Sequence, residues 1–380
     1  MTFDFIYILL NLLMLAIFIV AGQNVLLHKT YSGSVFICTL SFALVQGLRY
    51  MRGNDYIRYL HTYLHDDDPD QRLFTLLNQF LRNIGIGQHF FLIVYAAIFM
   101  ACVMHFLKPY RLYAKYAFPL SLMAFLTFNE YVIRQALGFS FVLLSISEII
   151  KLRQLQKQNT YARKMYSIYF RIICFSGIAF SIHSVSIVII AGVFAISLFP
   201  IAIPWYVASI VYSLVVFYIS ESFDWNMLGP ALEIIANNGD QLTSTYASNS
   251  EAWFSGNTNE EWGRNPVIKL LDLVGHWSLF FLMCKVIKRE KHHADFVLFY
   301  NTFVVGSCFF QLFFLNEILR RTAEPFHFFW FICLSIVLCN FKTLKLKFKS
   351  FIYLFLIFWI WDYVRYLFFR GESTMFIWDM

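Results

Sequence analysis

The chain has 380 residues, of which 59% are hydrophobic and 20% aromatic, while only 14% are charged. Soluble domains carry roughly 25% charged residues, so this composition excludes a soluble globular protein and indicates a polytopic membrane protein. The formal net charge of +7 is spread over many short loops rather than gathered in one basic module, which argues against a nucleic-acid-binding protein.

Apolar runs of about 20 residues, the length with which a helix crosses a bilayer, recur along the chain. They predict an all-α, polytopic integral membrane protein with about 12 transmembrane helices in a single transmembrane domain (residues 1–380). The start of the chain contains Asp4 but no Lys or Arg, so we expect a retained helix rather than a signal peptide. The expected spans are residues 5–21, 33–47, 89–107, 116–133, 135–150, 168–182, 185–199, 204–220, 267–286, 294–314, 323–341 and 350–368.

The basic residues predict an orientation in the membrane. One set of alternate loops holds 18 of the 30 Lys and Arg residues, so we expect it to be cytoplasmic, with both termini outside. This side holds 13 of the 14 lysines, whereas 11 of the 16 arginines lie on the outer side. The tendency of basic residues to stay on the cytoplasmic side explains the positions of the lysines but not those of the arginines. Because guanidinium binds phosphate or carboxylate through two parallel hydrogen bonds, the outer arginines indicate an anionic ligand there.

Cofactor motifs are missing from the sequence. It contains no HExxH, CxxC, Walker or GxGxxG pattern, and the adjacent His292 and His293 are interpreted as part of a solvated inner loop. All seven cysteines lie in apolar segments rather than in the expected outer loops, so we expect no disulfide framework. Neither a metal nor a nucleotide cofactor is predicted.

The first long outer segment, residues 48–88, carries five arginines and five aspartates. In its second half, apolar side chains recur at helical spacing, which predicts an amphipathic helix lying in the membrane interface. These side chains are Leu73, Leu77, Phe80, Leu81 and Ile84.

The same segment begins with a cluster of candidate site residues. If the chain is helical here, Asp55, Tyr59 and Tyr63 share one face, and Arg52 stands three residues before Asp55. Arginines, a carboxylate and ring hydroxyls would then converge on one site. In the alternative interpretation, Arg49 and Arg52 snorkel at a helix end and Asp55 forms an ion pair with one of them.

Two short turns on the same outer side add further candidates. Residues 128–136 contain Glu130 and Arg134, whose spacing of four also fits a structural ion pair. Residues 181–186 contain His183, and histidine suits proton transfer near neutral pH. A histidine at a helix turn often serves only in hydrogen bonding, so both interpretations stay open.

Charged residues also stand at a later outer turn. Within residues 316–325, Glu317 with Arg321 and Arg320 with Glu324 fit i, i+4 ion pairs as well as a binding site.

One carboxylate is expected deep inside a span. Asp272 lies in the span 267–286, where an ionised side chain is costly and usually functional. Lys269 and His276, at i−3 and i+4, are the candidate partners.

The second long outer segment, residues 221–265, is polar and has a net charge of −6. Plain connectors are rarely this long, so we expect the segment to have a function of its own. Its aromatic residues, including Trp253 and Trp262, alternate with Asn and Ser, which fits stacking on sugar rings. Packing of these rings onto the membrane surface is an equally good interpretation.

Taken in order, several of these motifs form a longer pattern. They are Arg49, Gly53, Asp55, Tyr56 and Tyr59 after the second span, then Arg134, Gln135 and Gly138, then His183, then Arg321 before a late aromatic span. This order, on one expected side and over the whole chain, resembles the EpsG-type branch of the Wzy polysaccharide polymerases.

The resemblance implies a multi-pass glycosyltransferase of the bacterial inner membrane with its active site on the periplasmic side, for which a GT-C-like arrangement of the helices is one option. Such an enzyme polymerises undecaprenyl-pyrophosphate-linked oligosaccharide repeat units into O-antigen or a related surface polysaccharide. The expected partners are the lipid-linked donor and acceptor glycans, membrane lipid and a chain-length regulator protein, with no nucleic acid and no metal or nucleotide cofactor.

This chemistry needs positive charge at the departing pyrophosphate and a base near the acceptor hydroxyl. We expect Arg49, Arg134 and Arg321 to supply the charge and His183 or Asp55 to be the base, with His183 favoured because a carboxylate among arginines is a weaker base. The expected substrate-binding residues are Arg52, Tyr56, Tyr59, Gln135, Arg320, Trp253 and Trp262.

Other functions compete with this hypothesis. A transporter or lipid-linked oligosaccharide flippase would carry ionisable residues deep in several spans, whereas Asp272 is the one clear case here. An O-antigen ligase, or a lipid-dependent transferase of a single sugar, would use the same outer surface and the same kind of donor, and the sequence does not separate these from a polymerase.

Overall fold

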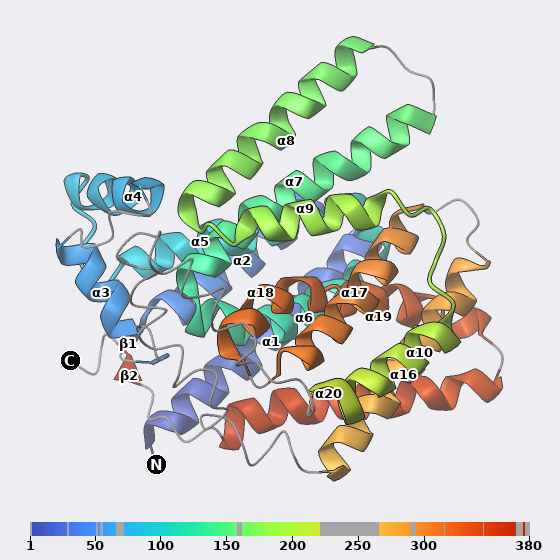
Figure 1. Cartoon of the computed structure of the whole chain (residues 1–380). Helices are drawn as coiled ribbons and strands as arrows, with labels where there is room; N and C mark the ends of the chain where they lie inside the picture. The colour runs from blue at the N-terminus through green and yellow to red at the C-terminus, as the bar shows by residue number, and fades with distance from the viewer. Residues whose placement is uncertain are drawn as a thin grey trace. The chain divides into compact units, whose positions relative to one another are not determined.

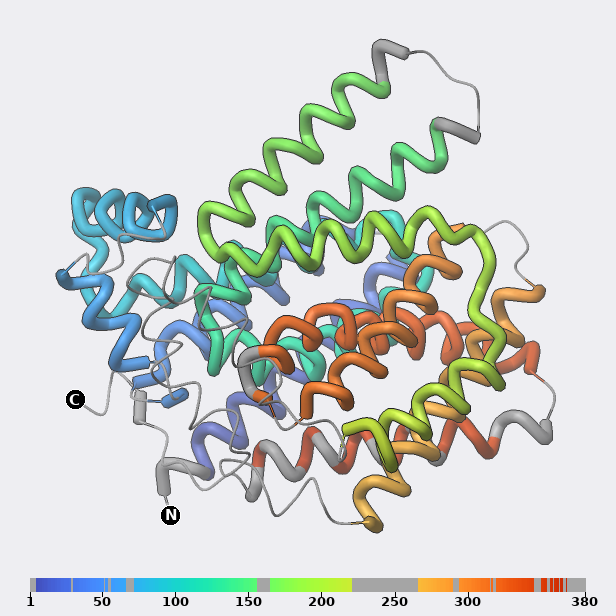
Figure 2. Tube along the Cα trace, viewed as in Figure 1, coloured from blue at the N-terminus to red at the C-terminus, as the bar shows by residue number. Residues whose placement is uncertain are grey.

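A computed structural model describes most of the chain (Figure 2). The described residues are 2–28, 30–50, 52–53, 56–65, 72–157, 162–220, 266–289, 294–314, 316–344, 346–369 and 375–376. They are almost entirely helical, which confirms the predicted all-α polytopic membrane fold (Figure 1). The polar segment 221–265, with Trp253 and Trp262, lies outside the described residues, as does Asp55.

Helices occupy each of the twelve expected spans. Within the described part of the chain, seven stretches are long and apolar enough to cross a membrane, and one of them, Phe91–Tyr131, comprises two helices joined by a short 3₁₀ turn. The other six are Phe5–His28, Ile133–Leu155, Met165–Ile182, Pro266–Ile287, Ala294–Leu312 and Leu319–Cys339, and the shorter apolar helices are Tyr31–Gly47, Ser186–Ser197 and Trp205–Ile219.

The chain forms two compact units, the first from Met1–Ala195 with Trp361–Met380 and the second from Ile196–Ile360. The elements of unit 1 are α1 (Thr2–His28), α2 (Tyr31–Gly47), β1 (Arg49–Tyr50), α3 (Tyr56–His65), α4 (Arg72–Asn83), α5 (Phe91–Leu107), η1 (Lys108–Tyr113), α6 (Ala114–Tyr131), α7 (Ile133–Lys157), α8 (Ala162–Ile182), most of α9 (Ser186–Ser197) and β2 (Met375–Phe376). In this unit α1 packs against α2 and α6, α2 packs against α5, and α7 packs against both α5 and α8. Helices α7 and α8 lie side by side as a hairpin (Figure 1).

The elements of unit 2 are α10 (Trp205–Leu214), the π-helical turn η2 (Val215–Ile219), α16 (Pro266–Ile287), α17 (Ala294–Leu312), α18 (Glu317–His327), α19 (Trp330–Cys339), η4 (Phe341–Thr343) and most of α20 (Leu346–Phe369). In this unit α10 packs against α16, α16 packs against α19, and α17 packs against both α18 and α19. Phe328 and Phe329 separate α18 from α19, so the expected span 323–341 consists of two helices rather than one.

The amphipathic helix expected in the segment 48–88 is α4, and the side that packs against the protein includes residues outside the predicted stripe. Phe74, Asn78 and Leu81 are buried, whereas Phe80 and Ile84 are each 57% exposed. The helix turns Asn78 inward because the Tyr95 hydroxyl donates a hydrogen bond to its side-chain oxygen. Hydrophobic spacing alone could not reveal this polar contact.

A short pairing of two strands was not expected from the sequence. Arg49 and Tyr50 of β1 pair antiparallel with Phe376 and Met375 of β2, so the far end of the chain lies beside the first candidate motif. Two-residue strands carry no periodic signal of their own.

Candidate active site

The centre of the candidate site is a break between two helices. α6 ends at Tyr131 and α7 begins at Ile133, because Val132 has the non-helical angles φ −128° and ψ 59°. At such a break the last carbonyl groups of one helix and the first amide groups of the next lose their helical partners. Polar side chains from elsewhere in unit 1 take up several of these groups.

Arg49 caps the C-terminal end of α6. Its Nη2 donates to the carbonyl oxygens of Asn129 and Glu130, both at 3.1 Å, and its Nη1 donates to the carbonyl and side-chain oxygens of Gln46 at 3.0 and 2.7 Å. A cation at a helix C-terminus also interacts favourably with the helix dipole. Arg49 therefore fixes the end of α2 to the end of α6.

Arg52 forms a buried ion pair with Glu130. Its Nε donates to Glu130 Oε1, the hydroxyl of Tyr7 donates to Oε2 at 2.9 Å, and the guanidinium lies 3.7 Å from the centre of the Tyr7 ring. Arg49, Arg52 and Glu130 are each at most 2% exposed. The interpretation of the two arginines as snorkelling side chains is therefore wrong, because their charged ends are enclosed by protein.

Gly53 lets the chain pass closely over Glu130. Its φ of +94° is in the region that favours glycine, and a Cβ atom at this position would lie 2.5 Å from the Glu130 carbonyl oxygen. A larger residue would push the segment after β1 away from the helix break.

The tyrosines of α3 extend the site towards the start of α7. Tyr56, Tyr59 and Tyr63 are buried, and the Tyr59 hydroxyl accepts a long hydrogen bond of 3.4 Å from the Arg134 backbone amide. Burial raises the pKa of Tyr56 to about 12, although the nearby positive charge of Arg49 opposes the shift. The Tyr56 hydroxyl therefore keeps its proton at neutral pH.

The first turns of α7 pack against the segment that contains His183. Arg134 and Gln135 are buried in the first turn, and Gly138 follows Arg134 by one turn on the same face. A Cβ atom on Gly138 would lie 3.0 Å from His183 Cβ and 2.8 Å from Ser186 Oγ. The half-buried His183 at the end of α8 thus stands one helical turn from Arg134.

Unit 1 therefore gathers most of the candidate residues from separate parts of the sequence. Glu130 and Arg134 lie on different helices, so the expected i, i+4 geometry of a continuous helix does not apply to them. Sequence reasoning missed Tyr7 and Gln46, and it did not find the pairing of Glu130 with Arg52, because only long-range contacts reveal these roles. The residues brought together are Arg49, Arg52, Tyr56, Tyr59, Arg134, Gln135 and His183.

The remaining candidate arginines belong to unit 2. Arg320 and Arg321 lie on α18, which begins with Asn316 as N-cap: its side-chain oxygen accepts from the Leu319 amide at 3.0 Å. The Arg320 guanidinium lies 5.9 Å from the ring of Phe314. The side chain of Glu317, the expected partner of Arg321, is outside the described residues.

A model of the EpsG family matches residues 34–377. The chain belongs to the EpsG family. No curated protein and no solved structure matches it. Membership of the EpsG family supports a role as a polysaccharide polymerase of the membrane, which is a glycosyltransferase activity.

The residue types at the start of α7 are ones that commonly bind anions. The N-terminus of α7 presents backbone amides and a positive dipole end, and Arg134 adds a guanidinium at the same place. Among the described residues, no group of three or more His, Cys, Asp or Glu side chains is arranged to hold a metal ion. The residues present suit the binding of phosphate or carboxylate groups.

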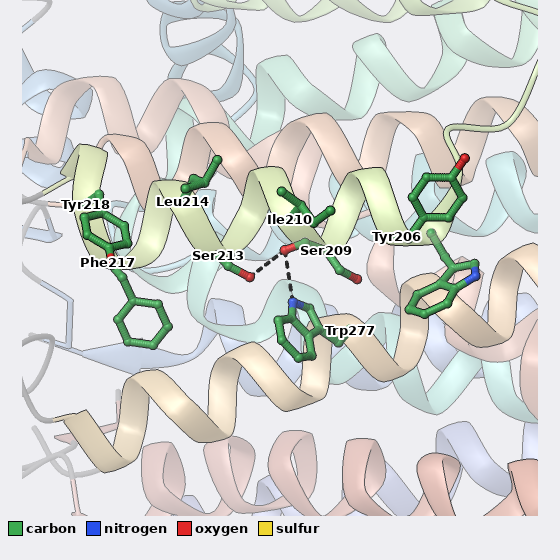
Figure 3. Close-up of a pocket in the computed structure, with 9 residues that line it drawn as sticks. Tyr206, Ser209, Ile210, Ser213, Leu214, Phe217, Tyr218 and Trp277 are labelled. Carbon is green, nitrogen blue, oxygen red and sulfur yellow. Dashed lines mark hydrogen bonds between the residues drawn. The ribbon is translucent and has the colours of Figure 1, made fainter.

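A separate groove lies along α10 and α16 in unit 2 (Figure 3). It has a volume of about 430 Å³ and a lining that is almost wholly apolar, including Trp205, Ile210, Phe217 and Trp277. The Trp277 indole donates to the Ser209 carbonyl at 3.1 Å, which joins the two helices beneath the groove (Figure 3). This lining suits an apolar chain better than a sugar or a phosphate group.

Proposed function

We propose that this protein polymerises polyprenyl-pyrophosphate-linked oligosaccharide repeat units into a surface polysaccharide. Undecaprenyl pyrophosphate is the carrier, the reaction takes place on the periplasmic face of the bacterial inner membrane, and neither a metal nor a nucleotide takes part. The observation that carries the proposal is the close packing of Gly138, one helical turn after Arg134 on α7, against His183, which follows α8, in a chain of the EpsG family.

The reaction joins two lipid-linked glycans. The acceptor hydroxyl loses its proton to a base, and its oxygen attacks the anomeric carbon of the donor glycan. The bond from this carbon to the pyrophosphate oxygen breaks, and its electron pair leaves with the pyrophosphate. The products are the longer glycan on one lipid and free polyprenyl pyrophosphate.

The charge distribution of the site supports this assignment. Pyrophosphate gains negative charge as it departs, and donors already aimed at its oxygens lower the barrier without reorganisation of water. In the proposed mechanism the Arg134 guanidinium binds the pyrophosphate, and Arg321 is proposed to bind an anionic group of the substrate. His183 is the base, and Asp55 is the alternative.

The arginines of the first motif act differently in this proposal. Arg49 directs four hydrogen bonds at protein oxygens, and Arg52 is paired with Glu130. We therefore assign both residues to holding the helix break in shape, so that the start of α7 faces the substrate. Tyr56, Tyr59 and Gln135 are proposed to contact substrate groups around this centre. Arg320 is also proposed to contact the substrate, and Trp253 and Trp262 to stack on sugar rings.

The test is complementation of a strain that lacks the gene, with the surface glycan separated on a gel. Arg134→Lys and Arg321→Lys should each reduce polymer by roughly a hundredfold to thousandfold in protein that reaches the membrane, because lysine cannot replace the planar fork of donors. Arg49→Lys should also reduce polymer, because lysine cannot make the four hydrogen bonds that hold the helix break. The product should be a single repeat unit. His183→Ala should behave in the same way, and a full ladder from it would move the role of base to Asp55.

Arg111→Lys is the matched control, because this arginine is exposed in η1, within an expected cytoplasmic loop. It should leave the ladder unchanged. Complete loss of glycan, rather than a single repeat, would instead indicate an earlier step such as lipid-linked oligosaccharide transport. Normal ladders from all three lysine variants of the proposed site would exclude the arginine mechanism.

A further inference from the structure

A second buried carboxylate, Asp272 of α16, lies at the centre of a hydrogen-bonded network in unit 2. His276 Nδ1 is 3.2 Å from Asp272 Oδ1, as the sequence spacing of four predicted. The other oxygen, Oδ2, accepts from the Tyr212 hydroxyl and from Gln311 Nε2, the latter at 3.0 Å. The carboxylate thus binds donors from three helices, α10, α16 and α17.

The network continues to α18 through a contact between two histidines. His276 Nε2 lies 3.1 Å from His327 Nε2. His276 Nδ1 also lies 2.9 Å from the Asp272 carbonyl oxygen, so this nitrogen faces acceptors and carries a proton. In neutral His276, Nε2 is then an acceptor, and His327 must donate its Nε2 proton.

Aromatic rings enclose both imidazoles. His276 stacks on Tyr212 with ring centres 4.6 Å apart and on Phe303 at 5.6 Å, and His327 stacks on Phe310 at 4.9 Å. His276 is 2% exposed and His327 7% exposed. Both imidazoles are therefore fixed by stacking on their faces and by hydrogen bonds at their nitrogens. This arrangement suits a structural role, in which the imidazoles hold the helices together, better than proton transfer to a substrate.

A close backbone contact reinforces the attachment of α18 at the same point. A Cβ atom on Gly306 of α17 would overlap the Phe326 carbonyl carbon and the His327 amide nitrogen. Only glycine allows α17 to approach α18 this closely. The network therefore holds the last residue of α18, while Asn316 caps its first turn.

We propose that the network of Asp272, His276 and His327 positions α18, and with it Arg321, for the polymerisation reaction. Arg321 precedes His327 by six residues on the same helix of 11 residues. These three are positioning residues that act through α18. The inference rests on the proposed function, because it assigns a task to the helix that carries Arg321.

Two conservative substitutions at His327 test the hydrogen-bond assignment. The amide nitrogen of Gln can take the place of Nε2 and donate to His276, whereas the shorter Asn cannot reach it. We expect His327→Gln to retain the polymer ladder, and His327→Asn to reduce polymer by about tenfold to hundredfold at equal protein level, since misplacement by about 1 Å costs this much. Equal ladders from the two variants would overturn the proposal.

A steric variant provides a second perturbation that leaves the histidines intact. Gly306→Ala should displace α18 and reduce polymer, whereas Gly177→Ala, at a helical glycine with no atom within 4 Å of the added methyl carbon, should have no effect. Should Gly306→Ala leave the ladder unchanged while the protein accumulates normally, the position of α18 would not matter for the reaction and the proposal would fail.

The position of α18 is also measured without reference to activity. A cysteine introduced at Thr322 on α18 is labelled with a membrane-impermeant maleimide, with the parent chain and its seven native cysteines as background. The labelling rate should change in His327→Asn but not in His327→Gln. An unchanged rate in both overturns the positioning role. A changed rate with a normal ladder supports the attachment of α18 and overturns the assignment of Arg321 to the reaction.

Discussion

The Glu130 cluster of unit 1 and the Asp272 network of unit 2 each enclose one carboxylate, but with different donors. Glu130 is paired with Arg52, a cation under all ordinary conditions, and with the hydroxyl of Tyr7. Asp272 is bound by an imidazole, a hydroxyl and an amide. The first arrangement balances charge, and the second depends on which nitrogen of each histidine carries the proton.

Substitution of the carboxylate should therefore affect the stability of the two clusters differently. Removing Glu130 leaves a guanidinium buried without its carboxylate, which is costly whatever the replacement. In the Asp272 network, a replacement that preserves the donors and acceptors should preserve the structure, since no permanent cation of the network needs the carboxylate.

The largest expected effect is that of Glu130→Ala. Breaking a buried ion pair by removal of one partner typically costs about 3 to 5 kcal/mol, because the remaining charge stays buried. Thermal unfolding of the detergent-solubilised protein, followed by fluorescence-detected size exclusion, should show a correspondingly lower midpoint. Glu148→Ala is the matched control: its partners Lys151 and Arg171 are nearly half exposed, so about 1 kcal/mol or less is expected. Equal losses in the two variants would contradict the distinction between the buried and the exposed pair.

Asp272→Asn should lower the free energy of unfolding less than Glu130→Ala does. In either orientation the amide group of Asn places an NH2 donor where a carboxylate oxygen now accepts, either from Tyr212 and Gln311 or from His276, and such a mismatch of buried polar groups costs about 1 to 3 kcal/mol. The same unfolding measurement checks it. If Asp272→Asn destabilised the protein as much as Glu130→Ala, the carboxylate of Asp272 would be balancing a charge, and the contrast between the two clusters would disappear.

The smallest effect of the three is that of Gly53→Ala. A residue with a side chain loses about 1 to 2 kcal/mol in the left-handed backbone conformation, and its methyl group would also press on the Glu130 carbonyl. We expect a modest drop in the unfolding midpoint together with a shorter polymer ladder, because the helix break shifts. Gly33→Ala, in α2 with no atom within 4 Å of the added carbon, serves as the control and should not destabilise the protein. A stable Gly53→Ala protein with full polymer would show that the segment after β1 does not shape the site.

Much of the fold could be predicted because membrane helices are specified locally. Runs of apolar side chains correctly located helices at all twelve expected spans. The order of the short motifs indicated the family without knowledge of any contact. The spacing of Asp272 and His276 likewise predicted their contact, since residues four apart on a helix are neighbours. At Glu130 the sequence spacing did not reveal the ion pair with Arg52, which lies 78 positions earlier in the chain.

The sequence by itself determined the class of the protein, the location of its helices and the residue types available for binding an anion, because each depends on composition or on neighbours within a few residues. Only the tertiary structure decided the partners. It paired Arg52 with Glu130, directed Arg49 at the end of α6, placed His183 beside Gly138 and joined His276 to His327. The Arg49 contact with Glu130 spans 81 positions of the chain and the contact between the two histidines spans 51. Sequence spacing cannot specify such pairs, because a buried polar group takes whichever partner the packing of helices brings within hydrogen-bonding distance.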